Sequence, residues 1–262
     1  MKTSDIFTLA IPNLRLVARL IPWDTVFFGF TVGQIDTLEC PKPHFNSAAL
    51  HPFFQWLDQN VVRLVSCRLP CDRLVESMLL EECGFKFVET VLHPYLNLPV
   101  SRCQDEDELV IAPATLADIP VLETIAANAF TTGRIHVDPR LGPTMGDRRY
   151  SRWVTNCLDH PSQRLFKVTN AEDMIIGLFI TEAGPDQSMY WHLTAIAPEC
   201  QGQGYGWRVW RAMLTRHTQE GMRSVSTTIT ARNIPVLNLY AKLGFRFLPP
   251  EITFHWIRET ER

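Results

Sequence analysis

The stretch Leu193-Thr-Ala-Ile-Ala-Pro-Glu-Cys-Gln-Gly-Gln-Gly-Tyr-Gly206 joins an apolar run to a glycine-rich loop. The apolar run predicts a strand, Pro198 ends it, and a helical pattern begins at about Trp207. Because the three loop glycines lack Cβ atoms, backbone N–H groups there can approach a ligand closely. The positive end of the following helix adds to the attraction for an anion. The stretch therefore predicts a phosphate-binding loop.

Two common phosphate-binding loops do not fit this pattern. A Walker loop ends in Gly-Lys-Ser/Thr, which is absent after Gln201. A dinucleotide-binding loop needs an acidic residue at the end of the next strand, and no such residue follows at that place. The loop must therefore be interpreted together with the residues downstream of it.

The flanking sequence alternates strands and helices, which predicts an α/β fold with a mixed sheet. In the second half, strands are expected from Ile111 and at 165–169, 174–182, 189–197, 224–230, 245–247 and 252–257, and helices at 118–130, 148–158, 207–220 and 235–243. In the first half, strands are expected at 14–20, 27–35, 61–69 and 85–92, and helices at 50–57 and 73–83.

An acidic segment divides these two halves. Residues 100–109 contain Asp105-Glu-Asp-Glu108 and follow Pro99, which is the composition of a linker. We therefore predict an N-terminal domain at 1–99, a linker at 100–109 and a C-terminal domain at 110–262.

The two halves also share a repeat. Gly84-Phe85-Lys-Phe87 and Gly244-Phe245-Arg-Phe247 each follow a predicted helix, and 244 − 84 = 160. Val65-Ser66 and Val225-Ser226 have the same spacing, since 225 − 65 = 160. This pattern favours an internal duplication. The first copy lacks the glycine-rich loop, so we expect it to keep the scaffold without the chemistry.

Composition limits the classes of partner. Apolar residues make up 46% of the chain and charged residues 20%, as in ordinary globular domains, and the net charge of −3 gives no reason to expect nucleic acid or a membrane surface. The seven cysteines have scattered spacing that completes no zinc site, so no metal is expected and free thiols in a reducing compartment are favoured. No signal peptide or membrane span is predicted, and we expect a cytoplasmic protein. A homodimer stays an open alternative.

Residues downstream of the loop complete a known pattern. Gln201-Gly-Gln-Gly-Tyr-Gly206 after an apolar strand, with Asn233, Tyr240 and then Gly244-Phe245, resembles the GNAT superfamily of N-acetyltransferases. The resemblance covers about residues 110–258 and implies a GNAT fold there. With the repeat, it implies a partial, degenerate GNAT-like domain in the N-terminal half.

The resemblance implies acetyl-CoA as co-substrate and direct acetyl transfer to a primary amine. It gives Asn233 a cofactor contact and Tyr240 the role of general acid to the CoA thiolate. The strand would offer main-chain groups to the pantetheine and an N–H to the thioester carbonyl. The expected cofactor-binding residues are Thr194, Ala195, Ile196, Gln201, Gly202, Gln203, Gly204, Tyr205, Gly206, Trp207, Asn233 and Tyr240.

A base must take a proton from the acceptor amine, because an ammonium has no lone pair. Glu182 and His192 are the predicted catalytic candidates beside Tyr240, since both fall near the ends of strands flanking the cleft. His136 is a further candidate, with Asp186 behind these groups. A water chain also stays open.

The acceptor is less sharply indicated. Trp23-Asp-Thr-Val-Phe-Phe-Gly29 and the segments 130–138 and 150–156 resemble dTDP-fucosamine acetyltransferases, which would make the acceptor a nucleotide-linked 4-amino sugar. Arg134, His136 and Asp138, with Arg140, are the expected acceptor-binding set, because loops between rigid elements carry specificity. A peptide N-terminus, a polyamine or another small amine is the alternative acceptor, and a non-catalytic acyl-CoA-binding module is the alternative function.

Overall fold

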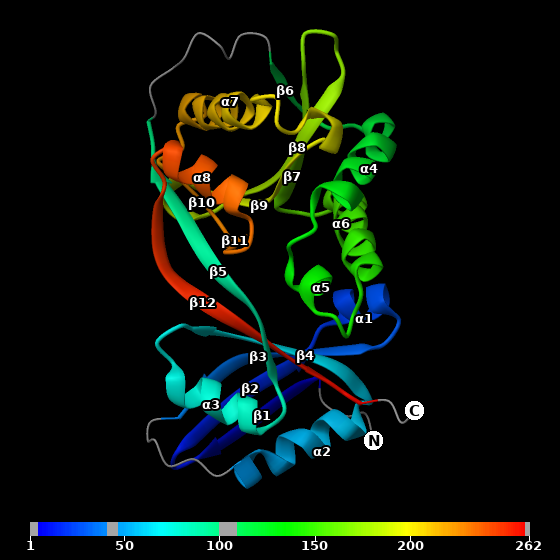
Figure 1. The fold of residues 1–262 in the computed structure, drawn as a ribbon, viewed down its shortest axis with the longest axis vertical. Helices are drawn as coiled ribbons and strands as arrows, with labels where there is room; N and C mark the ends of the chain where they lie inside the picture. Colours follow the sequence, from blue (N-terminus) through cyan, green and yellow to red (C-terminus); the bar gives the residue numbers. More distant parts are fainter. Residues whose placement is uncertain (1–4, 41–46, 100–108, 260–262) are drawn as a thin grey trace. The chain divides into compact units, whose positions relative to one another are not determined.

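The structure is a computed structural model, and it describes residues 5–40, 47–99 and 109–259. The chain divides into two compact units. Unit 1 comprises Met1–Val91 and Pro249–Arg262, and unit 2 comprises Leu92–Leu248. Figure 1 shows the elements of both units.

Unit 1 is a mixed sheet with helices packed on its core. Its strand order is β1-β2-β3-β4-β12, in which β3 and β4 are parallel and the other neighbours with a described register are antiparallel. The elements are β1 (Ile6–Ile11), β2 (Leu14–Leu20), α1 (Pro22–Phe28), β3 (Thr31–Glu39), η1 (Ser47–Leu50), α2 (His51–Gln59), β4 (Val62–Pro70), α3 (Leu74–Glu82) and β12 (Arg246–Ile257). Buried Phe53 of α2 and Leu79 of α3 join Leu16 and Val65 of the sheet in one apolar core.

Unit 2 holds the predicted loop. Its strand order is β5-β10-β9-β8-β7-β6. The strands are β5 (Lys86–Asn97), β6 (Val110–Pro113), β7 (Gln163–Thr169), β8 (Ile175–Ala183), β9 (Ser188–Ile196), β10 (Ser224–Thr227) and β11 (Ile229–Thr230). The helices are η3 (Leu116–Asp118), α4 (Ile119–Ala129), α5 (Arg134–Val137), α6 (Pro143–Cys157), η4 (Pro185–Gln187), η5 (Pro198–Cys200), α7 (Tyr205–Gln219) and α8 (Ile234–Lys242).

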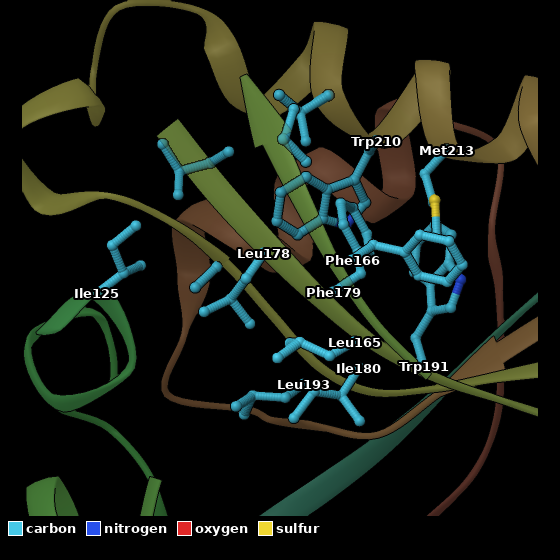
Figure 2. Close-up of a cluster of buried hydrophobic side chains, with 14 of the residues drawn as sticks. Ile125, Leu165, Phe166, Leu178, Phe179, Ile180, Trp191, Leu193, Trp210 and Met213 are labelled. Atoms are coloured by element: carbon cyan, nitrogen blue, oxygen red, sulfur yellow. The ribbon is translucent and has the colours of Figure 1, made fainter. Parts of the chain in front are cut away.

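The core of unit 2 lies between its sheet and its helices. Figure 2 shows Trp210 and Met213 descending from α7 onto Phe179 and Trp191 of the sheet. Ile125 of α4 belongs to the same buried cluster. Strand β9 alternates buried and half-buried residues, so one set of its side chains enters this core and the other set faces outward.

The two units exchange their last strands. β5 follows α3 of unit 1, yet its second part pairs with β10, where Val225 lies opposite Leu96. β12 follows α8 of unit 2, yet it pairs with β4, where Val65 lies opposite Trp256. Both spacings are the same, since 225 − 65 = 160 and 256 − 96 = 160. The predicted 160-residue repeat is confirmed in the register of the strands.

The structure departs from the sequence-based elements in several places. Strand β1 and helix α5 were not expected, and the strand expected at 224–230 is divided into β10 and β11. Residues 22–28 form helix α1, where a strand was expected from Phe27, because Pro22 fits the first turn and Gly29 at φ +73° ends the helix. The two strands expected at 245–257 are the single strand β12. Helix α6 starts earlier than expected, at Pro143.

The extents of the predicted domains also differ from the compact units. Residues 110–262 were expected as one domain, but Pro249–Arg262 belongs to unit 1. The exchange leaves no mark in local periodicity, so the sequence could not reveal it. The predicted linker, apart from Leu109, lies outside the described residues.

Candidate active site

Strands β9 and β10 run in parallel and then separate. β10 pairs with β9 from Ser188 up to Trp191, which lies opposite Thr227. The chain then continues into β11, which pairs with β5 instead. Among the described residues, β10 has no pairing with residues 194–196 of β9. That edge of β9 can therefore offer main-chain groups to an extended ligand.

The other edge of β9 is irregular at the same level. The register with β8 shifts between the pairs Ile180↔Leu193 and Thr181↔Trp191, so that His192 is an extra residue. Such a β-bulge bends a strand and redirects a side chain. The bulge and the end of the β9–β10 pairing thus coincide within one residue.

The glycine-rich loop lies beyond β9. Gly202 and Gly204 have φ of +74° and +83°, which residues with side chains rarely adopt, and no atom lies within 4 Å of a Cβ built on either one. Helix α7 begins after Gly204 without a side-chain cap. Its first N–H groups and the open space above the loop suit an anion.

Two glutamine side chains brace this loop. Gln201 donates from Nε2 to the Ile196 carbonyl at 3.1 Å, and Gln203 donates to the Glu199 carbonyl at 2.7 Å. Both hydrogen bonds join the loop to the segment that directly precedes it, so the side-chain amides of Gln201 and Gln203 stabilise the conformation of the loop.

Helix α8 brings Tyr240 to the separation point. The side chain is 1% exposed and lies edge-on to Phe245, with ring centroids 4.8 Å apart. Its hydroxyl lies beside the side chains of Trp210, Thr194 and Thr227. Burial raises the pKa of the phenol, and these neighbours lower it by a smaller amount. The phenol therefore holds its proton at neutral pH.

Asn233 caps helix α8. Its Oδ1 accepts the N–H of Val236 at 3.4 Å, and it stands seven residues before Tyr240, two turns along the same helix. Asn233 and Tyr240 thus come from the start and the end of one short helix.

Glu182 and His192, two of the predicted base candidates, lie next to each other on β8 and β9. His192 Nε2 lies 2.7 Å from Glu182 Oε2, and Ser162 Oγ donates to Glu182 Oε1 at 2.6 Å. These contacts, that of Ser162 first, lower the pKa of the Glu182 carboxyl. The imidazole is oriented by a carboxylate that stays ionised, and it is 20% exposed.

Two aromatic rings lie beside the His192 imidazole. Trp153 of α6 and Tyr190 of β9 lie 5.9 Å and 4.7 Å from the imidazole, and Arg149 lies over the Trp153 ring at 5.5 Å. Sequence reasoning named neither Ser162 nor Tyr190 for this site. Trp153 fell inside the segment 150–156, but no role was expected for it.

The three predicted acceptor residues lie on or beside the four-residue helix α5. His136 stacks on Tyr150 and its Nε2 lies 2.9 Å from Asp147 Oδ1. Asp138 accepts two hydrogen bonds from the Arg140 guanidinium, at 2.8 and 2.7 Å. These two side chains are engaged within the protein. Arg134 is half-buried at the start of the helix.

A groove of about 570 Å³ adjoins the glycine-rich loop between α4 and η5. Its lining residues are Pro120, Val121, Thr124, Ile125, Asn128, Pro198 and Glu199. Trp207, in the first turn of α7, makes two cation–π contacts. The Lys242 ammonium lies 4.5 Å and the Arg211 guanidinium carbon 5.5 Å from the centre of its ring.

Cys200, next to the loop, is poorly suited to covalent acyl transfer. The side chain is buried, and burial together with the nearby Glu199 raises the pKa of its thiol. The nucleophilic thiolate is therefore disfavoured.

Residues 132–245, which lie wholly inside unit 2, match the model of the Acetyltransferase (GNAT) family. This part of the chain is a GNAT acetyltransferase domain. The matched range contains β9, the glycine-rich loop and Tyr240. A search of curated protein sequences finds no match to the chain.

Solved structures share the fold over nearly the whole chain. A GCN5-related N-acetyltransferase from Sphaerobacter thermophilus has a TM-score of 0.63 and 11% identity, over 92% of this chain and 76% of that one. A GCN5-related N-acetyltransferase from Kribbella flavida has a TM-score of 0.59 and 15% identity, and the alignment covers 96% of this chain and 89% of that one. A tandem GNAT protein from the clavulanic acid biosynthesis pathway has a TM-score of 0.55 and 12% identity, and the alignment covers 95% of this chain and 80% of that one. At such identities the likeness concerns the fold alone. Among the described residues, no helix has the length and apolarity needed to cross a membrane.

Proposed function

We propose that the chain transfers an acetyl group from acetyl-CoA to a primary amine, and that this amine belongs to a nucleotide-linked 4-amino sugar. One observation carries the proposal. The Tyr240 hydroxyl is buried between Thr194 of β9 and Thr227 of β10, at the level where these strands separate. A proton donor placed beside an unpaired strand edge suits the departure of a thiol from an extended thioester.

The residues of unit 2 fit acetyl-CoA. The N–H groups of the loop Gln201–Gly206 would hold the pyrophosphate, supported by the open space above Gly202 and Gly204. The unpaired edge of Thr194, Ala195 and Ile196 would bind the pantetheine amides. Tyr205, Trp207 and Asn233 would contact the rest of the molecule. Acetyl-CoA supplies the activated acetyl group.

Tyr240 would act as the general acid. Because burial raises the pKa of its phenol, the proton is present at neutral pH and is available to the thiolate that leaves. The nearby Trp210 and Thr194 side chains can stabilise the oxygen after the proton has moved.

His192 would take the proton from the acceptor amine. Glu182 holds its Nε2, which orients the ring and stabilises the imidazolium that forms. The bulge places this pair directly before the unpaired residues of β9. His192 and Tyr240 would thus act from opposite ends of the reaction.

The aromatic rings beside His192 support a sugar acceptor. Trp153 and Tyr190 offer apolar surfaces to a sugar ring, and Arg149 over Trp153 offers positive charge to a diphosphate. We keep Arg134, His136 and Asp138 in the proposed acceptor site. Since His136 and Asp138 contact Asp147 and Arg140, their proposed role is to hold the shape of the loop around Arg134.

A thiol-release assay with the full chain and acetyl-CoA tests the proposal. The amines to compare are nucleotide-linked 4-amino sugars, free amino sugars, a peptide N-terminus and a polyamine. We expect turnover with the nucleotide-linked sugars. Turnover with the peptide or polyamine alone would refute the acceptor and keep the acetyltransferase.

The Tyr240→Phe variant tests the acid. We expect kcat to fall by about a hundredfold or more while acetyl-CoA affinity, measured by calorimetry, stays within about twofold. Leu80→Met, at the equivalent position of α3 in unit 1, is the control and should leave kcat unchanged. An unchanged kcat in Tyr240→Phe would remove the general-acid role.

A further inference from the structure

One buried donor lies next to the Tyr240 hydroxyl without a hydrogen bond of good geometry. Trp210 is 3% exposed, and among the described residues its indole Nε1 meets the geometric criteria for a hydrogen bond with no acceptor, although it lies close enough to the Tyr240 hydroxyl to lower the pKa of the phenol. The ring is held by packing, because the Phe179 ring is tilted against it with the ring centroids 5.2 Å apart. Figure 2 shows both residues in the buried cluster. An indole N–H left unpaired in a core costs stability, so its position calls for an explanation.

The explanation lies in what surrounds the Tyr240 oxygen. The side chains beside this hydroxyl are those of Trp210, Thr194 and Thr227. Thr227 Oγ1 already donates to the Trp191 carbonyl at 2.8 Å, so toward Tyr240 it can only accept. The Thr194 hydroxyl can donate or accept. The indole N–H can only donate, so it favours an oxygen that has lost its proton.

We propose that Trp210 is a positioning residue for acetyl transfer, whose indole N–H donates to the Tyr240 oxygen as the phenol gives its proton to the departing thiolate. The inference rests on the proposed function. The N–H lies beside the hydroxyl without a well-formed hydrogen bond, and a bond of this kind tightens when negative charge develops on the oxygen.

The proton balance of the step is complete. The amine nitrogen forms a bond to the acetyl carbon, and the carbon–sulfur bond breaks. The surplus proton of the amine passes to the Glu182–His192 pair and on to solvent. The thiolate takes the proton of Tyr240, and the phenolate that is left accepts from Trp210 until a proton returns from solvent.

A double-mutant cycle on the full chain tests this role. Kinetics are measured with acetyl-CoA and the nucleotide-linked 4-amino sugar that the amine panel identifies. Trp210→Phe should lower kcat by about tenfold or more, as expected for a donor to a charged group, with KM for acetyl-CoA within about twofold. In the Tyr240→Phe background, Trp210→Phe should have almost no further effect, because no phenolate forms there.

The pH profile separates a donor from a packing residue. Activity falls at high pH as Tyr240 loses its proton. Since Trp210 lowers the pKa of that phenol, its removal should shift the high-pH limb of kcat upward while the plateau falls. Met213→Leu, a volume-conserving change in the same core, should alter neither the plateau nor the limb.

A second variant covers the case in which Trp210→Phe does not fold, as judged by thermal unfolding. A ring-fluorinated tryptophan placed at 210 keeps the shape and makes the N–H a stronger donor, so the high-pH limb should move downward. Additive losses in the double mutant, or an unmoved limb in either variant, would overturn the role of Trp210 and leave the acetyltransferase standing. Absence of turnover with every amine would refute the proposed function and this inference with it.

Discussion

Each unit of the molecule carries a pair of polar side chains on a strand bulge. In unit 1, Arg19 donates from Nε to Asp36 Oδ2 at 2.8 Å. In unit 2, His192 Nε2 lies 2.7 Å from Glu182 Oε2. The two pairs look unrelated in sequence, yet they occupy the same places in the two sheets.

The registers establish this equivalence. Ile35 of β3 and Trp191 of β9 are each the last residue paired with the neighbouring parallel strand, opposite Cys67 and Thr227. Directly after this residue, the register with the antiparallel neighbour shifts by one residue. That neighbour is β2 in unit 1 and β8 in unit 2, and in each unit the next residue is the extra residue of a β-bulge. Those extra residues are Asp36 and His192.

The difference between the pairs is chemical. The guanidinium of Arg19 has no lone pair that could accept a proton, and it donates to Asp36. A neutral imidazole has one nitrogen that can accept a proton, and the ionised Glu182 orients the ring of His192. Unit 1 also has Leu80 at the place of Tyr240. The bulge and the separated strands are thus common to both units, and among the described residues unit 2 combines them with the side chains that we propose to move protons.

The largest effect we expect comes from cutting the chain at its predicted linker. A fragment of residues 110–262 lacks β5, and so loses the strand that pairs with β10. The loss should exceed the usual total stability of about 5–15 kcal/mol, and the fragment should be unfolded by circular dichroism.

The fragment 86–248 is the matched control. It keeps all strands of unit 2 and omits most of β12, which pairs with β4 of unit 1. It should show a cooperative thermal transition. A cooperative transition in 110–262 comparable to that of the full chain would mean that the exchanged strand is dispensable.

The second effect comes from placing the pair of unit 1 into unit 2. The double variant Glu182→Arg, His192→Asp should fold and bind acetyl-CoA, and kcat should fall by about a hundredfold because a carboxylate paired with a guanidinium is a much weaker base than the imidazole it replaces. The reverse change in unit 1, Arg19→Glu with Asp36→His, should leave kcat unchanged. Steady-state kinetics decide the matter, and equal losses in the two double variants would end the assignment of the base to unit 2.

The third effect concerns the loop that only unit 2 possesses. The paired residues Trp191 and Thr227 of unit 2 are 227 − 191 = 36 positions apart. The equivalent pair of unit 1, Ile35 and Cys67, is 67 − 35 = 32 positions apart. Gly204→Ala puts a side chain at φ +83°, which should cost about 1 kcal/mol and disturb the first N–H groups of α7.

For Gly204→Ala we expect the Kd of acetyl-CoA to rise by about tenfold, by calorimetry. Gly221→Ala has the same strain, at φ +78°, but lies at the far end of α7 and should leave the Kd unchanged. A similar Kd change in both variants would show that the loop glycines matter only for the backbone.

Much of this site could be predicted from the sequence, because its pieces are local. The glycine-rich loop, the cap Asn233 and the helical spacing to Tyr240 are read within single elements. The strand exchange and the bulge depend on pairing between distant residues, which periodicity does not encode. Ser162 was not expected at the site for the same reason, since its contact with Glu182 spans 182 − 162 = 20 positions. A packing role beside the cofactor was expected for Trp210, but its contact with Tyr240, which spans 240 − 210 = 30 positions, was not expected.

The smallest effect concerns Ser162, which donates to Glu182 in unit 2. Among the described contacts of unit 1, no serine hydroxyl contacts the Arg19–Asp36 pair. The Ser162 hydroxyl is the largest cause of the lowered pKa of Glu182, so Ser162→Ala should raise that pKa toward its ordinary value. A carboxylate with a lowered pKa is lost as pH falls through that value, so the acid limb of kcat/KM should move to higher pH in the variant. At neutral pH, Glu182 stays ionised in both proteins, and kcat should fall by only about two- to threefold, as expected for one partly exposed hydrogen bond. Ser151→Ala on α6 is the control and should leave the limb in place. An acid limb that moves to lower pH in Ser162→Ala would show that Ser162 does not hold Glu182 in its ionised form.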